Sequence, residues 1–414
     1  KMTLETIFSD TQAINRHRTG PLGAYQDNFC QWMQENGFSA STMRSHTCYL
    51  TRFSEHLAKH PIMDFSLINQ AKTDWLKQKD LSLSPVICAY AVNCFIRYLR
   101  QSGDLVEPEP PDPYRVFMAP YSLWLRDYLG TAAATINLRE HYLRQFLEQL
   151  KINMLEMSLA QQTPDSIQHF FLEYVHKHGM AARRSMQATL RSFLQFCYVK
   201  GIIQQDLSSA VPTLRTYKLA TLPRSVSESD ALKVFSDIGR DTKVGKRDYA
   251  IFRLLYHYGV RNGQIRALRL QDIDWRQEII RFPALKHGNP ITVPLVEEVA
   301  EALLDYLQHS RPQSTSCSEI FLTTRAPYHP LYHHSALSEI VSRYLRRLPI
   351  KPPCLGARVY RHCFATRMLQ QGNYLKSIAD VLGHRCLQTT TIYTKVDFNS
   401  LQRVPLELPA EEVL

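Results

Sequence analysis

A proline-rich segment near residue 110 separates the chain into two parts. Residues 107–113 read Glu-Pro-Glu-Pro-Pro-Asp-Pro, and proline can neither continue a helix nor donate a hydrogen bond to a strand. This segment is therefore predicted to be a stiff, extended linker. A second linker is predicted at residues 212–224, where helical periodicity stops, and Ser227 with Asp230 then offers a capping box for a new helix. The predicted organisation is a first module (1–106), a second module (114–211), a third segment (225–400) and a tail (401–414).

The first two modules repeat one helical pattern. Five residues of the first match five of the second at a constant offset, and three more match further along. Apolar side chains spaced three and four residues apart lie on one face of a helix, so each module is predicted to be a bundle of about four or five helices. Chance similarity between two unrelated bundles is the alternative. The matched pairs are Thr42 and Thr135, Tyr49 and Tyr142, Leu50 and Leu143, Phe53 and Phe146, Leu57 and Leu150, Phe95 and Phe193, Tyr98 and Phe196, and Gly103 and Gly201.

The third segment changes from helical to mixed patterning. Helical periodicity over residues 231–238, 249–258 and 265–268 is followed by two β-rich runs, Glu278–Phe282 and Pro290–Leu295. The turn residues 286–289 between the runs favour an antiparallel hairpin. Helices are expected from Val296 to the end. The predicted fold class is therefore mainly α with a small antiparallel sheet, two helical bundles preceding a mixed α/β domain.

The charge balance favours a polyanionic partner. Lysine and arginine number 49 against 38 acidic residues, a formal net charge of +11, which suits nucleic acid although an acidic protein partner stays open. Basic residues also accompany the helical stripes of both modules and are predicted to contact phosphates. A solvated helix face is the alternative for each one. These residues are Arg44, Arg52, Arg97, Arg100, Arg139, Arg144, Arg183, Arg184 and Arg191.

The cysteines and the hydropathy pattern exclude other classes of protein. Nine cysteines occur without a C-x-x-C pair or a clustered Cys/His spacing, so neither a disulfide framework nor a zinc finger is predicted. Reduced thiols in a cytoplasm are the expectation. No apolar run approaches the roughly 18 residues of a membrane span, so no membrane partner is expected.

The third segment contains, in a fixed order, the residue types that phosphodiester cleavage without a metal requires. Such a reaction needs a nucleophile, cations that neutralise the charge on the transferring phosphorus, and an acid for the leaving oxygen. The two arginines of the set lie 100 residues apart, 23 residues separate the second from a histidine, and nine more lead to a tyrosine. The motifs are Gly259-Val260-Arg261, Lys286 in the hairpin turn, Arg358 to His362 followed by Phe364-Ala365-Thr366, Leu382-Gly383-His384, and Thr390 to Thr394 around Tyr393.

This order of motifs resembles the tyrosine recombinases, the phage integrase and XerC/XerD-like family, over residues 225–400. The second module also resembles the core-binding domain of that family. The resemblance implies that two arginines fork onto the scissile phosphate, a role that suits guanidinium geometry. It also implies a lysine that protonates the 5′ oxygen, a histidine that donates to the phosphate, and a tyrosine that forms a 3′-phosphotyrosyl link. The implied catalytic residues are Arg261, Arg361, Lys286, Arg358, His384 and the nucleophile Tyr393.

Two positions depart from the family pattern. The family usually has histidine where this chain has Arg358, and glutamate where this chain has Gln264. The first departure removes a proton acceptor near the tyrosine. The second removes a carboxylate, whose hydrogen bond an amide can replace but whose charge it cannot.

The departures keep a second function open. The leading expectation is an integrase or transposase of a mobile element that recombines double-stranded DNA without metal, ATP or any other cofactor, in the bacterial cytoplasm at the nucleoid. A homotetramer on DNA, with or without related recombinases, is the expected assembly. A non-catalytic, DNA-binding accessory member of the family is the alternative, and a type IB topoisomerase is a third.

Overall fold

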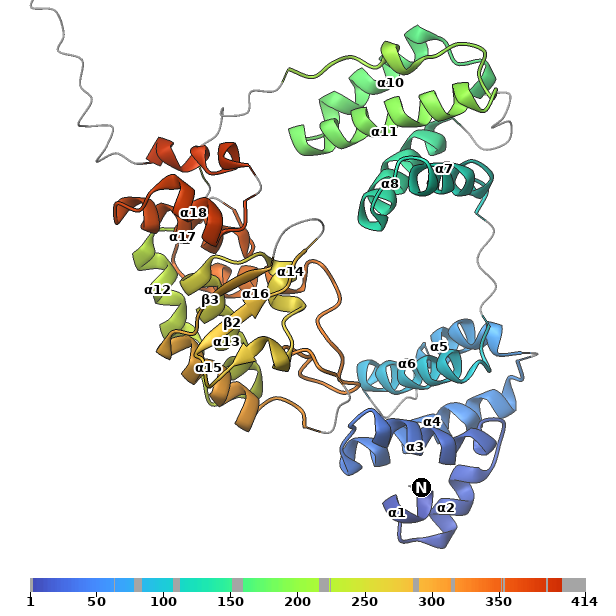
Figure 1. The fold of residues 1–414 in the computed structure, drawn as a ribbon. Coiled ribbons are helices and arrows are strands. Elements are labelled where there is room, and N and C mark those ends of the chain that lie inside the picture. The colour runs from blue at the N-terminus through green and yellow to red at the C-terminus, as the bar shows by residue number, and fades with distance from the viewer. Residues whose placement is uncertain are drawn as a thin grey trace, which may run out of the picture. The chain divides into compact units, whose positions relative to one another are not determined.

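The computed structural model divides the chain into two compact units, Lys1–Val106 with Leu219–Leu414, and Glu107–Lys218 (Figure 1). None of the helices within the described part of the chain is long and apolar enough to cross a membrane. The residues that the structure describes are 3–62, 64–77, 84–106, 112–150, 159–215, 223, 225–285, 290–313, 317–350, 352, 354–384 and 386–396.

The first module is a helical bundle with a core of its own. Phe29, Leu50, Phe53 and Phe95 are fully buried within it, and Ser39 caps the long helix α4 by accepting a hydrogen bond from the backbone N–H of Thr42. Its helices are α1 (Leu4–Ile7), α2 (Thr11–Arg18), α3 (Gln26–Glu35), α4 (Ala40–Lys59), α5 (Ile68–Leu76) and α6 (Pro85–Ser102), with the 3-10 turns η1 (Gly23–Tyr25) and η2 (Phe65–Leu67).

The second module is also helical, and a separate apolar core fills it. The longest helix of this bundle, α11, contributes Leu190, Phe193 and Leu194 to the core with no exposed surface. The described helices of this unit are α7 (Arg115–Asp127), α8 (Ala133–Gln149), α10 (Pro164–Lys177) and α11 (Met180–Val199), followed by η4 (Ser208–Ala210).

The residues of the predicted repeat occupy corresponding places in the two bundles. Leu50 and Phe53 of α4 are fully buried, as is Leu143 of α8, and Phe146 is 1% exposed. Gly103 directly follows the end of α6, with φ +86°. Gly201 follows the cap residue of α11, with φ +73°. Glycine adopts this left-handed conformation without the cost that a Cβ atom imposes. These matched residues therefore have similar packing or capping roles in the two bundles, and the repeat itself stays a prediction.

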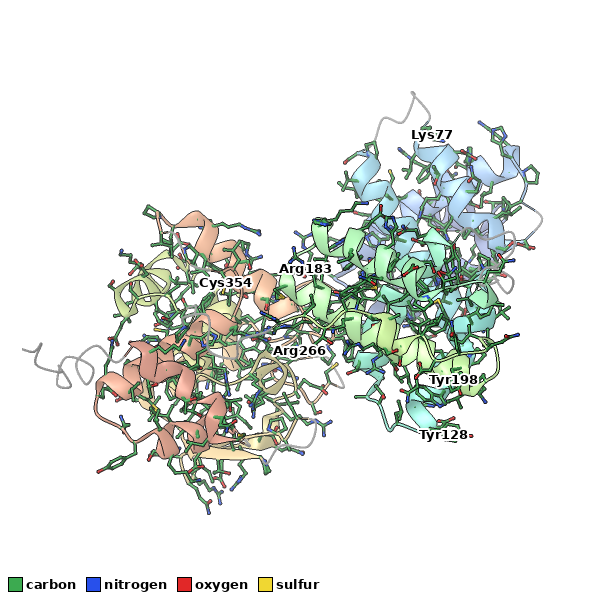
Figure 2. The ribbon with its side chains drawn as sticks, turned by 90° about the horizontal axis from the view of Figure 1, so that it is seen from above. Lys77, Tyr128, Arg183, Tyr198, Arg266 and Cys354 are labelled. Atoms are coloured by element: carbon green, nitrogen blue, oxygen red, sulfur yellow. The ribbon has the colours of Figure 1, made fainter. Side chains whose placement is uncertain are left out.

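Several basic residues of the second module hold its own structure together. Arg144 forms a forked ion pair with Asp112, and Arg183, labelled in Figure 2, donates to the backbone carbonyl of His178. Arg191 likewise donates to the carbonyl of Val211 at 2.7 Å. These contacts fix the guanidinium groups in space, which the charge pattern of the sequence alone does not reveal.

The third segment combines helices with a three-stranded antiparallel sheet in the order β1-β2-β3. Ile280 pairs with Val293 and Phe282 with Ile291, and these side chains point into the core. The short strand β1 was not predicted, because two residues carry no periodicity. The elements are α12 (Glu228–Asp237), α13 (Lys243–Tyr258), α14 (Asn262–Arg266), η5 (Leu270–Asp272), β1 (Ile273–Asp274), β2 (Ile279–Phe282), β3 (Ile291–Pro294), α15 (Glu297–His309), α16 (Ala336–Arg347), α17 (Arg358–Gln370), α18 (Leu375–Val381), η6 (Leu387–Thr389) and η7 (Thr391–Val396).

A buried carboxylate fixes α13 against α16. Asp248 has no exposed surface and accepts hydrogen bonds from Arg247 at 2.8 Å, Arg343 at 2.6 Å and the Tyr344 hydroxyl at 3.2 Å. A buried charge with several donors is stable, whereas one left without them costs several kcal/mol. This cluster therefore holds α13 in place, and α13 leads directly into the first predicted arginine motif.

The expectation of helices from Val296 to the end is wrong for the residues between α15 and α16. The described residues there form turns and two isolated bridges, between Arg269 and Glu319 and between Leu322 and Pro330. The guanidinium of Arg311 donates to the carbonyls of Cys317 and Glu319, which replaces the hydrogen bonds that a helix would make. Side-chain bonds of this kind leave no periodic signal in a sequence.

Candidate active site

The first arginine motif begins where α13 ends. Gly259 adopts φ +57° and donates its N–H to the carbonyl of Leu255, which terminates the helix in the left-handed conformation. A Cβ atom at this glycine would lie 2.7 Å from a ring carbon of Phe364. The tight turn brings Arg261 to the surface of the site, where its guanidinium donates to the carbonyl of Gly383 at 3.0 Å.

The second arginine lies one turn inside α17 and is almost fully buried. Arg361 is 8% exposed, and it donates to the carbonyl of Gly259 at 2.9 Å and to that of Leu382 at 2.7 Å. Its guanidinium therefore spans the C-terminal ends of α13 and α18, where helix carbonyls lack a partner within the helix. Two of its five N–H donors are used in this way, and the planar fork has others for a ligand.

The histidine motif ends α18 through a Schellman turn. The N–H of Gly383 donates to the carbonyl of Asp380 and that of His384 to the carbonyl of Ala379, at 2.9 and 2.8 Å. Gly383 has φ +61°, and a Cβ atom there would lie 2.8 Å from the Cδ1 atom of Ile291. The glycine therefore sets both the direction of His384 and the carbonyl that Arg261 binds.

The predicted nucleophile lies on η7 and is 2% exposed. The ring of Tyr393 packs in a small apolar cluster with Phe364, Ile378 and Leu382, between α17 and α18. Its hydroxyl lies 3.1 Å from the Nδ1 atom of His362, the residue after Arg361. Apolar packing thus fixes the ring, while the reactive oxygen points at a polar partner.

His384 also has a partner from the segment that carries the tyrosine. The Nδ1 atom of His384 lies 2.7 Å from the hydroxyl of Thr390, and the Thr390 side chain is fully buried. With the threonine hydroxyl donating, the neutral imidazole carries its proton on Nε2. His384 is then arranged to donate one hydrogen bond from Nε2.

Burial and positive charge set the protonation of these groups. Burial, followed by the charge of Arg261, lowers the pKa of Arg361 to about 10. Burial together with the charges of Arg361 and Arg261 lowers the pKa of His384 to about 4, so this imidazole is neutral near pH 7. Burial raises the pKa of Tyr393, which the charges of Arg361 and Arg358 oppose. The site is therefore strongly cationic before any ligand enters.

Gln264 replaces the usual family glutamate and uses both ends of its amide. Its side-chain oxygen accepts from the backbone N–H of Arg261 at 3.1 Å, and its nitrogen donates to the carbonyl of Pro283 at 3.4 Å. A carboxylate could make the first bond but not the second. The amide therefore ties the start of α14 to the end of β2.

The structure brings four of the six predicted catalytic residues, Arg261, Arg361, His384 and Tyr393, around the ends of α13, α17 and α18. Arg358 is the exposed first residue of α17, and its charge acts on Tyr393 and on Arg361. The prediction for Lys286 falls outside the described residues. His362 belongs to the second arginine motif, but the sequence predicts no role for it, because residue spacing does not show that its ring meets the tyrosine.

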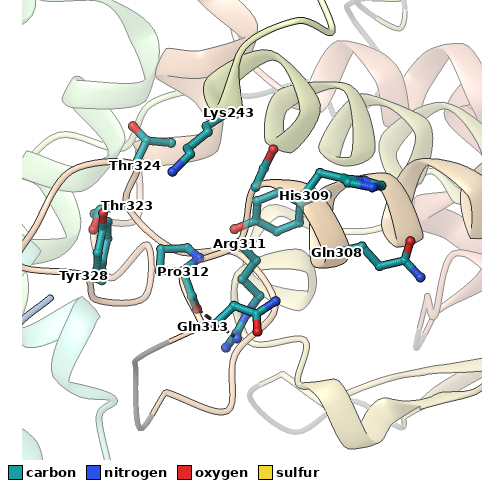
Figure 3. Close-up of a pocket in the computed structure, with 11 residues that line it drawn as sticks. Lys243, Gln308, His309, Arg311, Pro312, Gln313, Thr323, Thr324 and Tyr328 are labelled. Carbon is teal, nitrogen blue, oxygen red and sulfur yellow. Dashed lines mark hydrogen bonds between the residues drawn. The ribbon is translucent and has the colours of Figure 1, made fainter.

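A separate cavity of about 240 Å³ lies beside the end of α15 (Figure 3). Lys243, His309 and Arg311 are among the residues that line it, and none of the predicted catalytic residues that the structure describes does so. Within the same described ranges, no group of three His, Cys, Asp or Glu side chains is placed to hold a metal ion. Four of the predicted catalytic residues lie instead at the junction of α13, α17 and α18.

The chain is similar to known integrases along nearly its whole length. The model of the phage integrase family matches residues 227–400. A putative integrase/recombinase of Sinorhizobium fredii, y4rA, is 31% identical and covers 96% of this chain and 97% of that protein. Tyrosine recombinase XerD of Proteus mirabilis is also 31% identical, over 66% of this chain and 86% of that protein. The chain therefore belongs to the phage integrase family and is a tyrosine recombinase, an enzyme of site-specific DNA recombination.

Solved structures share the fold. XerH site-specific recombinase, in a pre-cleavage complex with its difH substrate, has a TM-score of 0.52 at 18% identity and covers 75% of this chain and 92% of that one. A lambda integrase dimer bound to a COC′ core site has a TM-score of 0.51 at 17% identity, over 67% and 94% of the two chains. The mainly helical architecture with a small antiparallel sheet is thus that of the recombinases.

Proposed function

We propose that this chain cleaves and rejoins double-stranded DNA through a 3′-phosphotyrosyl link on Tyr393, as the integrase or transposase of a mobile element. The observation that carries the proposal is the meeting of two guanidinium groups, a neutral histidine and the tyrosine at the ends of three helices. A transferring phosphoryl group needs this combination of charge neutralisation and an oriented nucleophile.

The proposed roles follow from the geometry of each side chain. Arg261 and Arg361 bind the non-bridging oxygens of the scissile phosphate, and His384 donates to the same group from Nε2. Each unit charge about 4 Å from the phosphate contributes up to ~4 kcal/mol at an effective dielectric near 20. Lys286 protonates the departing 5′ oxygen, and Arg358 adds positive charge next to Tyr393. Atoms balance because the tyrosine oxygen replaces the 5′ oxygen on phosphorus, so neither ATP nor a metal is needed.

The assembly and the location of the enzyme are part of the proposal. The XerH and lambda integrase structures are complexes with DNA, the second of them a dimer. We propose that this chain binds two duplexes as a homotetramer, with or without related recombinases, in the bacterial cytoplasm at the nucleoid. The bacterial origin of the relatives and the net charge of +11 support this.

The two helical modules divide the DNA contacts in this proposal. The second module (114–211) grips the core site together with the catalytic domain (225–400), and the first module (1–106) binds additional DNA or neighbouring protomers. A chain that begins at Pro113 is expected to retain binding to a short core duplex while its footprint or its assembly shrinks. If the shortened chain has the same footprint, assembly and recombination as the full chain, the first module has some unrelated role.

Covalent capture tests the function and finds the substrate. The full chain is mixed with a randomised pool of nicked duplexes, which trap the cleaved state because the short 5′ fragment diffuses away, and DNA that survives denaturation on the protein is sequenced. Adducts are expected with EDTA present, and binding is expected to weaken steeply with salt as counterions are released. Absence of any adduct would favour the accessory, non-catalytic role. Relaxation of supercoils without exchange between two selected sites would favour a topoisomerase.

A further inference from the structure

The tyrosine hydroxyl meets a histidine that has no role in the proposed reaction so far. The Nδ1 atom of His362 lies 3.1 Å from the Oη atom of Tyr393, and the two ring centres are 5.7 Å apart with planes tilted by 57°. A donor–acceptor distance near 3 Å is that of a hydrogen bond through which a proton can pass. The two residues come from different elements, α17 and η7, so their contact is a product of the fold.

Packing makes this contact a fixed one. The ring of Tyr393 is held by Phe364 and Ala365 of α17 and by Ile378 and Leu382, and it is 2% exposed. His362 belongs to the same helix as Phe364 and Ala365. The helix that packs against the phenol ring therefore also carries the imidazole.

The charges around His362 favour its neutral form. Burial, then the positive charges of Arg358 one helical turn before it and of the adjacent Arg361, lower its pKa to about 4. The charge of His362 in turn contributes to lowering the pKa of His384. Above about pH 5 His362 is uncharged and has a lone pair for a proton when its own proton is on Nε2. The guanidinium of Arg358, which stands where the family usually has histidine, has no such acceptor nitrogen.

We propose that His362 is a further catalytic residue of this chain, the group that accepts the phenolic proton of Tyr393 during DNA cleavage. As the Oη–H bond breaks, the proton moves to Nδ1 while Oη forms its bond to phosphorus and the bond from phosphorus to the 5′ oxygen breaks. The departing oxygen takes a proton from Lys286. In the rejoining step the 5′ hydroxyl returns its proton to Lys286 as it attacks phosphorus. The bond from phosphorus to Oη breaks, and the His362 imidazolium returns its proton to the tyrosine oxygen. This inference rests on the proposed function.

The position of His362 accounts for the departure at Arg358. The phosphate and the developing phenolate both carry negative charge, which raises the pKa of His362 from its low value toward that of a useful base. Arg358 supplies a cation on the same helix face, one turn away, and the two residues divide the tasks of charge stabilisation and proton transfer. The proton acceptor of this chain, His362, therefore lies four residues after position 358, where the family usually has its histidine.

Replacement of His362 by asparagine tests the proposal. The amide oxygen of asparagine reaches roughly the place of Nδ1 and can accept a hydrogen bond from Tyr393, but it does not take up a proton near neutral pH. Single-turnover cleavage of the captured nicked duplex is expected to fall by ~100-fold or more, in the range of general-base catalysis. The parental rate should become constant once the pH exceeds the raised pKa of His362 in the DNA complex, whereas the variant should keep gaining about tenfold per pH unit, because hydroxide then removes the proton.

Two controls distinguish the base from other roles. A substrate with sulfur in place of the 5′ bridging oxygen has a leaving group that needs no proton, so it should rescue Lys286→Ala but not His362→Asn. His257→Asn changes another partly buried histidine, on α13 and bonded to Arg253, and should cleave at the parental rate. A His362→Asn variant that cleaves like the parent, or whose defect is equal at every pH, would overturn the proposal. Failure of the parent itself to form an adduct would instead overturn the proposed function.

Discussion

The cationic half of the site and its nucleophile half are held by different kinds of interaction. In the cationic half, Arg261 and Arg361 bind backbone carbonyls at the ends of helices. In the nucleophile half, the position of Tyr393 on η7 depends on apolar packing and on the contact of its hydroxyl with His362. Substitutions in the first half should therefore reduce stability and activity together, whereas substitutions in the second should reduce activity with little change in stability.

The largest expected effect belongs to Tyr393→Phe. The ring, which carries the packing, is retained, and only the hydroxyl is removed, so DNA binding and the melting temperature should stay near those of the parent. No adduct that resists denaturation should form. Gel shifts and denaturing gels on the same nicked duplex measure the two properties. An adduct that persists in the variant would place the nucleophile at another residue.

Arg361→Lys should follow, with losses in both activity and stability. An ammonium group cannot span the carbonyls of Gly259 and Leu382 while facing a phosphate. Loss of charge-assisted hydrogen bonds worth about 1.5–3 kcal/mol should lower the melting temperature by several degrees. Cleavage should slow by ~1,000-fold, which corresponds to about 4 kcal/mol.

Arg367→Lys is the matched control for that variant. Arg367 lies on the same helix and donates to the carbonyl of Tyr256 at 2.8 Å. Its guanidinium also lies over the rings of Tyr256 and Phe364, and its described contacts include none of the predicted catalytic residues. It should lose stability and keep most of its cleavage rate. Equal losses of cleavage in both variants would mean that stability alone governs the cationic half.

The Arg358 series should give an intermediate effect. Arg358→Ala removes a positive charge that lowers the pKa of Tyr393, so this pKa should rise further and cleavage near neutral pH should fall by ~10- to 100-fold. Arg358→Lys keeps the charge, and Arg358→His restores the usual family residue, so both should retain substantial activity. Single-turnover rates against pH are the measurement, with DNA binding checked separately. Parental cleavage by the alanine variant would make Arg358 a structural cation.

The smallest effect is expected for Thr390→Val. This change removes the hydroxyl that orients His384 while it preserves the shape of a fully buried side chain. The unsatisfied imidazole nitrogen should cost ~1 kcal/mol of stability, and cleavage should drop by ~10-fold. Thr389→Val, next to it and exposed, serves as the control and should leave the rate unchanged. A defect shared by both variants would implicate the shape of η6 instead of the histidine.

The sequence predicted the parts of the molecule whose determinants are local. The matched apolar residues of the two modules predicted two bundles, and the paired β-rich runs predicted the hairpin β2–β3. The ordered motifs identified Arg261, Arg361, His384 and Tyr393 as one set, although their catalytic roles stay predictions. The role of Lys286 stays a prediction as well.

Other features depend on tertiary contacts that no spacing in the sequence encodes. The contact between His362 and Tyr393 requires α17 and η7 to pack together across 31 residues of chain. The irregular segment after α15 depends on the hydrogen bonds of Arg311 to carbonyls, which have no periodicity. The nitrogen of the Gln264 amide likewise finds its partner, the carbonyl of Pro283, only once β2 is in place.

The two helix-ending glycines of the site have a consequence for how relatives of this chain diverge. Gly259 and Gly383 each combine a positive φ with a neighbouring atom that a Cβ would approach within 3 Å, and each lends its carbonyl to an arginine. A side chain at either position would strain the backbone and at the same time displace an arginine of the proposed site. Active relatives should therefore keep glycine at these two positions. Gly103 and Gly201 have open space around them and can be exchanged for asparagine. Loss of either site glycine in a family member would mark a lineage that has stopped cutting DNA.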